Sequence, residues 1–271
     1  MVTTRVTWDS LPDSIRRDIE ARTGPLSSVE PVSSGFNSEL AVVLRSADGA
    51  TFVKGLRADH PRVWTQNREK AVNPHVRPVT AALRWSIDND EWNLLAFEHT
   101  PGRHIDYSPG SLDLAKFVQS LRTLQELPCP DIELKLAEKR WASYTDSPEL
   151  FAGDYVLHTE WSPSNVLVGD AALFVDWAWA TRGAAWIDPA CWVVWLIASG
   201  HSPQDAESWA AQIPSWNDAP ADAVAAFAAA QAAMWSAIAE ADPEPWIKDM
   251  AAAAQRWSES RRIGARSQTA R

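Results

Sequence analysis

Residues 155–168 read YVLHTEWSPSNVLV. Two short apolar runs, YVL and VLV, enclose a polar segment that a proline interrupts, which is typical of a loop between two strands. The loop carries His158, Glu160 and Asn165. A carboxylate can accept a proton from a reacting hydroxyl, and an amide oxygen can bind a hard cation. This loop is therefore the first candidate for a functional site.

Three further side chains outside the loop suit the same chemistry. Asp176 ends the next apolar run, LFVD, eleven residues after Asn165. Upstream, Lys54 ends the apolar run TFVK, and Glu69 follows fifteen residues later in a segment expected to be helical. A turn with the sequence SSGFNS, residues 33–38, precedes the strand that leads to Lys54.

Phosphoryl transfer is one reaction that uses all of these residue types. The charge of a nucleoside triphosphate must be held and neutralised, which a lysine on a strand can do. A glutamate on a neighbouring helix can orient that lysine, and an Asp with an Asn supplies oxygen ligands for Mg²⁺. A turn with glycine lets the backbone approach phosphates. Each feature alone is weak, and their order and spacing carry the hypothesis.

The composition excludes several other classes of protein. The 271 residues allow one large domain or two lobes, and the formal net charge of −10 argues against nucleic acid as a partner. Only Cys129 and Cys191 are present, which gives neither a zinc site nor a disulfide framework. No membrane span or secretion signal is evident, so we expect a cytoplasmic protein that is a monomer or a homodimer.

The expected secondary structure of the chain changes near residue 100. Residues 1–100 hold strand patterns, among them a hairpin around Asp48-Gly49, and an initial helix that Ser10 is expected to cap. The segment 171–179 reads as another short strand, AALFVDWAW. Most of residues 101–271 show helical spacing of apolar residues. The sequence predicts an α+β fold, with an N-terminal antiparallel sheet plus helix and a mainly helical C-terminal part.

These motifs resemble those of the aminoglycoside phosphotransferase family, the small-molecule kinase branch of the protein-kinase-like fold. The family pattern H-G-D-x-x-x-x-N is similar to HTEWSPSN, matching at His158 and Asn165. VDW matches at Asp176 and IDPA at Asp188, while LLAFEHTPGR is similar to the hinge of the family. The likeness spans about residues 30–200. It implies a two-lobed fold, with an N-lobe of residues 1–100 and a C-lobe of residues 101–271 that carries a catalytic loop, 158–165, and a metal loop, 176–188.

The resemblance implies a role for each matched residue. ATP, or alternatively GTP, would bind with Mg²⁺, and its γ-phosphate would pass to a hydroxyl of a small molecule. Glu160 would be the catalytic carboxylate, and His158 and Asp188 would brace the loop. Asn165 and Asp176 would hold the metal ion. The nucleotide-binding residues implied are Ser34, Gly35, Phe36, Asn37, Ser38, Lys54, Glu69, Phe97, Glu98 and Thr100.

The sequence departs from the family pattern at the centre of the loop. Thr159 stands where the family has Gly, and Glu160 stands where it has Asp. The extra methylene moves the carboxylate by roughly 1 Å, and a misplacement of that size can cost about 100-fold in rate. Glu160 can still work, the enzyme can be slow, or the chain is a nucleotide-binding pseudokinase that acts as an interaction module. A helical scaffold without a nucleotide site is a third, weaker alternative.

The sequence does not identify the molecule that accepts the phosphate. The resemblance implies a small hydroxylated molecule, in some members a cationic one, such as an aminoglycoside. Asp205, Glu207 and Asp218 could face a cation, but each of them could equally be a helix cap or a charge on the surface. Trp177, Trp179 and Trp186 could pack a ligand, but core packing is the better interpretation for at least two of them.

Overall fold

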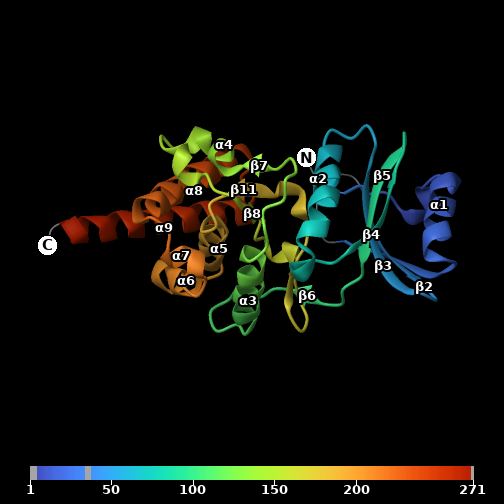
Figure 1. The fold of residues 1–271 in the computed structure, drawn as a ribbon, viewed down its shortest axis with the longest axis horizontal. Helices are drawn as coiled ribbons and strands as arrows, with labels where there is room; N and C mark the ends of the chain where they lie inside the picture. Colours follow the sequence, from blue (N-terminus) through green and yellow to red (C-terminus); the bar gives the residue numbers. More distant parts are fainter. Residues whose placement is uncertain (1–4, 34–37, 270–271) are drawn as a thin grey trace.

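The N-terminal part of the computed structural model, which describes residues 5–33 and 38–269, is a five-stranded antiparallel sheet (Figure 1). The strand order is β1-β2-β3-β5-β4. The predicted hairpin joins two of these strands, and Gly49 adopts φ 114° at the turn, which a residue with a side chain rarely does. The strands are β1 (Leu26–Pro31), β2 (Leu40–Ser46), β3 (Gly49–Arg57), β4 (Leu83–Asp88) and β5 (Trp92–Glu98).

Two helices lie on opposite faces of this sheet (Figure 1). Helix α1 (Asp13–Thr23) buries Ile15 and Ile19 against apolar side chains of β2, β3 and β5. Helix α2 (Val63–Val72) stands between the sheet and the C-terminal part (Figure 1). The prediction that Ser10 caps α1 is wrong. Pro12 is the N-cap, and the Ser10 hydroxyl donates to the Thr7 carbonyl inside a preceding 3-10 turn, too far from the first helical amides.

The C-terminal part is mainly helical and contains two small sheets that hold the candidate loops. Strand β8 pairs with β11, and β9 pairs with β10, so residues 158–165 connect two strands as predicted. The predicted strand 171–179 is shorter than expected, because the chain leaves β10 and forms a 3-10 turn, η7 (Trp177–Trp179). The remaining elements are β6 (Arg103–His104), α3 (Asp113–Gln125), β7 (Lys135–Leu136), α4 (Ala137–Arg140), β8 (Tyr155–Leu157), β9 (Val166–Val168), β10 (Ala172–Phe174), β11 (Thr181–Gly183), α5 (Ile187–Ala198), α6 (Pro203–Ala210), α7 (Pro214–Asn217), α8 (Ala221–Ala241) and α9 (Pro245–Thr269).

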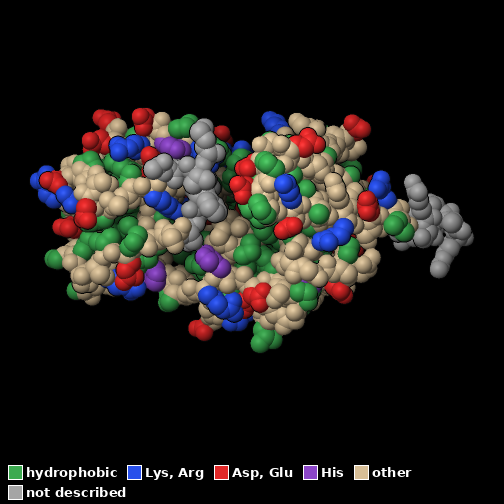
Figure 2. Space-filling model, turned by 180° about the vertical axis from the view of Figure 1, so that it is seen from behind, with side chains coloured by type: hydrophobic (Ala, Val, Ile, Leu, Met, Phe, Trp, Pro, Cys, Tyr) green, Lys and Arg blue, Asp and Glu red, His purple; other side chains and the backbone are tan. Residues whose placement is uncertain are grey.

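The two parts form two rounded halves that meet at a narrower waist, and charged side chains of both signs are interspersed over the face shown (Figure 2). We place the boundary between them near residue 100, in the segment that follows β5. The mixed architecture, an antiparallel sheet followed by a helical part, confirms the predicted α+β fold class.

Tryptophan mainly fills the core of this fold. Of the sixteen Trp residues, eight are buried, and six of these are less than 2% exposed. Trp177 and Trp186 are buried, whereas Trp179 is half-buried and stays a candidate for ligand contact. The six are Trp92, Trp141, Trp161, Trp177, Trp192 and Trp257.

In the part of the chain that the structure describes, one helix, α8, is long and apolar enough to cross a membrane by length and composition. Such a single helix is weak evidence for a span. Helix α8 contacts α9 along its length and buries Phe227 against Trp141 and Phe151. These contacts pack one side of α8 against the rest of the C-terminal part, and 33% of its apolar window is buried.

Candidate active site

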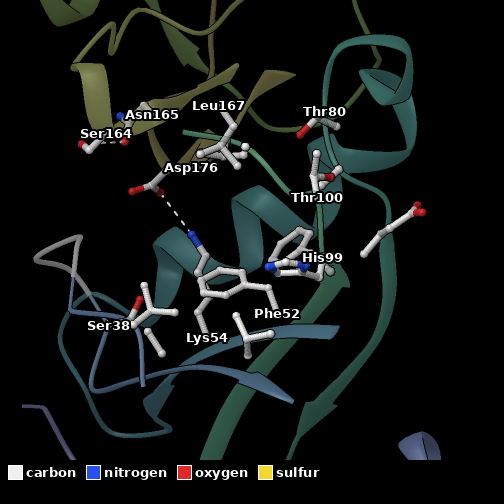
Figure 3. Close-up of a pocket in the computed structure, with 18 of the residues that line it drawn as sticks. Ser38, Phe52, Lys54, Thr80, His99, Thr100, Ser164, Asn165, Leu167 and Asp176 are labelled. Atoms are coloured by element: carbon white, nitrogen blue, oxygen red, sulfur yellow. Dashed lines mark hydrogen bonds and ion pairs between the residues drawn. The ribbon is translucent and has the colours of Figure 1, made fainter. Parts of the chain in front are cut away.

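A cavity of about 270 Å³ opens between the sheet and the C-terminal part (Figure 3). It brings together residues that are far apart in the sequence, and most of the predicted nucleotide-binding residues line it. The predicted residues in its lining are Ser38, Lys54, Glu69, Phe97, Glu98, Thr100, Asn165 and Asp176. Ser34, Gly35, Phe36 and Asn37 lie outside the described residues.

Lys54 is the charged centre of the cavity. Its Nζ lies 2.6 Å from Glu69 Oε2 on α2 and 3.3 Å from Asp176 Oδ1, which comes from the C-terminal part (Figure 3). Burial alone would lower the pKa of Lys54, but the two carboxylates outweigh it and raise the pKa, so the ammonium stays charged. Burial raises the pKa of Glu69 to about 6 despite the attraction of Lys54. The geometry fixes a cation deep in the cavity and aims it toward the C-terminal part.

Asn165 and Asp176 lie on the C-terminal side of the same cavity (Figure 3). The Asn165 amide nitrogen donates to the Glu160 carbonyl at 3.0 Å, which leaves the amide oxygen to act as a ligand. Carboxylate and amide oxygens are the donor set that Mg²⁺ accepts, and Mg²⁺ commonly takes few protein ligands together with phosphate oxygens and water. The side chains present therefore fit a magnesium ion.

Apolar side chains from both parts form the walls of the cavity around the hinge segment. Ala41 of β2, Phe52 of β3 and Leu167 of β9 line it. Phe97 is 7% exposed and lies beside Lys54. The Glu98 amide already donates to the Ala82 carbonyl at 2.8 Å, so this N–H is not available to a base.

The loop 158–165 is held in place by buried polar contacts. The Asp188 carboxylate accepts the amides of His158, at 3.0 Å, and Thr159, at 2.8 Å. The His158 Nε2 contacts the Val175 carbonyl at 2.9 Å, while its Nδ1 accepts the Glu160 amide at 3.3 Å. These partners assign a neutral imidazole with its proton on Nε2.

Burial controls the protonation of both bracing residues. It lowers the pKa of His158 to about 4, which agrees with the neutral ring. It raises the pKa of Asp188 to about 7, against the opposing effect of the two amide donors. The positions of both residues are those expected of a brace, and their contribution to activity stays a prediction.

Two residues of the site adopt a left-handed backbone conformation, which residues other than glycine usually avoid. Thr159 has φ 69° and Asp176 has φ 64°. A β-branched residue in this region is strained, whereas glycine is not. Thr159 stands at the position where the family pattern has Gly, and here a threonine adopts a conformation that glycine adopts without strain.

Glu160 points toward an arginine that the sequence analysis did not single out. Arg140 Nη2 lies 2.5 Å from Glu160 Oε1, and Nη1 of the same side chain contacts the hydroxyls of Thr159 and Thr181. Burial raises the pKa of Glu160, and Arg140 opposes that rise. The two residues that depart from the family pattern, Thr159 and Glu160, thus share one partner.

Sequence reasoning missed several residues that the structure brings to the site. Arg140 lies twenty residues before Glu160 in a short helix, and no motif marks it. In the cavity lining, His99 directly follows the predicted Glu98, so its place in the hinge could have been a signal. Other lining residues that were missed include Thr80, His104, Ser164, Leu167 and Val175.

Two of the three acidic residues considered for a cationic acceptor, Glu207 and Asp205, have partners within the helical part. Glu207 Oε1 lies 2.6 Å from both Arg261 Nε and Trp257 Nε1. Asp205 contacts Ser202 at the start of α6. Neither residue is in the lining of the cavity that holds Lys54.

No protein-family model and no curated protein matches this sequence. Solved structures do match. Choline kinase LicA from Streptococcus pneumoniae has a TM-score of 0.63 at 12% identity, with 92% of this chain and 99% of that chain covered. Aminoglycoside phosphotransferase APH(4)-Ia has a TM-score of 0.60 at 12% identity, covering 93% and 98%. A thermostable variant of it, bound to AMP-PNP and hygromycin B, has a TM-score of 0.59 at 14% identity, covering 93% and 99%. The chain therefore has the protein-kinase-like fold that small-molecule kinases share.

Proposed function

We propose that this protein is an ATP-dependent phosphotransferase that acts on a hydroxyl of a small molecule. The observation that carries the proposal is the cavity in which the Lys54–Glu69 pair faces Asp176 and Asn165. A cation on a strand, two oxygen ligands and an apolar slot are the parts that hold a nucleoside triphosphate for transfer. The proposal is also supported by the similarity of the fold to structures named as a choline kinase and an aminoglycoside phosphotransferase.

Each residue has a task in this reaction. Lys54, oriented by Glu69, binds phosphate oxygens, and the apolar walls take the base. Asn165 and Asp176 would hold Mg²⁺, which neutralises phosphate charge when bound. The acceptor oxygen forms a bond to the γ-phosphorus while the bond from that phosphorus to the β–γ bridging oxygen breaks, and ADP leaves. Glu160 accepts the proton of the acceptor hydroxyl and returns it to solvent.

A thermal-shift titration with ATP, Mg²⁺ and both together tests the nucleotide site. A ligand that binds only the folded protein raises its melting temperature as the ligand concentration rises. We expect a rise that requires both ATP and Mg²⁺. The rise should be lost in Lys54→Met and kept in Lys248→Met, a control on the exposed part of α9. No shift with ATP or GTP at millimolar concentration in the wild-type protein would refute the nucleotide site.

The pseudokinase is the second candidate, and the ion pair between Arg140 and Glu160 is the observation that favours it. The guanidinium of Arg140 occupies a carboxylate oxygen of Glu160, which makes that carboxylate a weaker base than an unpaired one at the same burial. On this alternative, the protein binds ATP without transferring phosphate. Measurement of ADP formation in the presence of hydroxylated acceptors, with Glu160→Gln as the control, separates the two candidates. Turnover that depends on Glu160 supports the transferase.

A further inference from the structure

Three cationic and two aromatic side chains lie together beside Glu160. They are Arg68 and Trp64 of α2, Lys135 of β7, Arg140 of α4 and Trp179 of η7, and we call them the basic–aromatic cluster. The cluster joins the N-terminal helix α2 to the C-terminal part. Because Arg140 contacts Glu160 directly, the cluster borders the carboxylate at which the acceptor hydroxyl must arrive.

The members of the cluster contact one another closely. The Trp64 and Trp179 rings meet edge to face with centroids 5.6 Å apart. Lys135 Nζ lies 4.9 Å from the Trp64 centroid and 4.5 Å from that of Trp179. The guanidinium of Arg68 lies 5.0 Å from the Trp64 ring, and that of Arg140 lies 5.1 Å from the Trp179 ring. Aromatic rings thus hold three like charges near each other.

The acids near this cluster do not balance its charge. Glu160 pairs with Arg140, and exposed Glu133 acts on Arg68 only at a distance. Arg68 Nε and Nη1 are buried and have no hydrogen-bond partner among the described residues. Within the same described part of the chain, Lys135 Nζ makes no ion pair. Burial, then Arg68 and Arg140, lower the pKa of Lys135, as expected for cations that lack a counter-ion.

We propose that the basic–aromatic cluster binds an anionic group, a carboxylate or a phosphate, of the acceptor molecule. This inference rests on the proposed function. It assigns an acidic hydroxylated acceptor, because an ammonium group beside Arg68, Lys135 and Arg140 would be repelled, whereas an anion supplies the missing partner. An anion held there leaves the hydroxyl of the same molecule next to Glu160.

Calorimetric titration of the protein saturated with AMP-PNP and Mg²⁺ tests the cluster, because the nucleotide then occupies the site around Lys54. The probes are 4-(hydroxymethyl)benzoate, its phosphate counterpart 4-(hydroxymethyl)phenyl phosphate, and the matched amine 4-(hydroxymethyl)benzylamine. We expect both anions to bind more tightly than the amine, and to weaken as salt rises. The anion that binds more tightly shows whether the cluster prefers a carboxylate or a phosphate. Tighter binding of the amine, or no binding of either anion, overturns the proposal.

Variants locate the binding on the cluster. Lys135→Met and Arg68→Met keep long unbranched side chains and remove the charge, and Lys139→Met removes an exposed charge on α4 as the matched control. We expect anion affinity to fall at least about tenfold in each cluster variant, the loss typical of a charged hydrogen bond, and to stay unchanged in the control. Equal affinity in folded cluster variants overturns the proposal. If a variant does not fold, the affinities of the wild-type protein for the anions and for the amine still test the proposal.

The proposed function can fail separately from this inference. If AMP-PNP does not bind, the transferase proposal fails, and the same anions are titrated into the free protein. A loss of affinity in Lys135→Met but not in Lys139→Met then still supports an anion site at the cluster. If AMP-PNP binds and the anions bind equally to all variants, the anion site fails while the nucleotide site stands.

Discussion

Replacement of Thr159 measures the backbone strain in the loop 158–165. Its φ of 69° costs a residue with a Cβ about 1–2 kcal/mol relative to glycine. Thr159→Gly removes this strain but also the hydroxyl contacts with Arg140 and with the His158 carbonyl, at 2.6 Å. Thr159→Ala removes the same contacts and keeps the strain. The difference between the two variants therefore isolates the backbone conformation.

Glycine loses more freedom on folding than alanine, which offsets part of the gain by roughly 0.4–1 kcal/mol. We therefore expect Thr159→Gly to be more stable than Thr159→Ala by about 0.5–1 kcal/mol. This reverses the usual order, in which alanine is the more stable residue.

Urea unfolding of both variants, followed by circular dichroism, gives the two free energies of unfolding. Ala152→Gly is the control, because Ala152 is exposed and has φ −65°, where glycine should cost about 0.4–1 kcal/mol. If alanine at position 159 is as stable as glycine or more stable, the loop is not strained there and the reasoning is refuted.

Three further predictions concern the site. Glu160→Asp draws the carboxylate back by roughly 1 Å, so we expect kcat for phosphate transfer to fall about 100-fold, with KM for ATP unchanged; a rise in kcat would contradict this. Glu69→Gln leaves Lys54 with Asp176 as its remaining carboxylate, and we expect weaker ATP binding by calorimetry; unchanged affinity would show that Glu69 does not orient the lysine. The pKa of His158 is about 4 in the folded protein, below the ordinary 6.5, so the unfolded chain binds more protons between these values. The stability that His158 contributes is then complete above pH 6.5 and lost as the pH falls toward 4, by up to about 3 kcal/mol. His158→Gln should remove that part of the pH dependence in urea unfolding, and an identical profile would exclude it.

Sequence alone was sufficient where a pattern is local. The turn at Asp48-Gly49, the strand that carries Lys54 and the loop between β8 and β9 follow from short-range chemistry, and the structure contains all three, although β3 continues past Lys54 to Arg57. The cap at Ser10 failed for a local reason as well, because Pro12 takes that position.

Contacts between segments that are far apart in the sequence could not be predicted. Arg140 reaches Glu160 because β7 pairs with β11, which places α4 beside the loop. Its sequence context, AEKRW, is that of any charged helix end. The gathering of Arg68, Lys135 and Arg140 depends in the same way on the packing of α2 against η7, which no residue spacing encodes.

The departures from the family pattern are better explained by compensation than by decay. A loop that loses its function is expected to lose its supports, yet Asp188 still accepts both loop amides and Asn165 still contacts the Glu160 carbonyl. The two residues that depart from the pattern, Thr159 and Glu160, both contact Arg140. Arg140 in turn belongs to the cluster of cations that we assign to an anionic acceptor. Arg140 thus connects the proposed general base to the site proposed for the charge of the substrate. The retained supports of the loop, rather than this ion pair, favour phosphate transfer over a nucleotide-binding protein without activity.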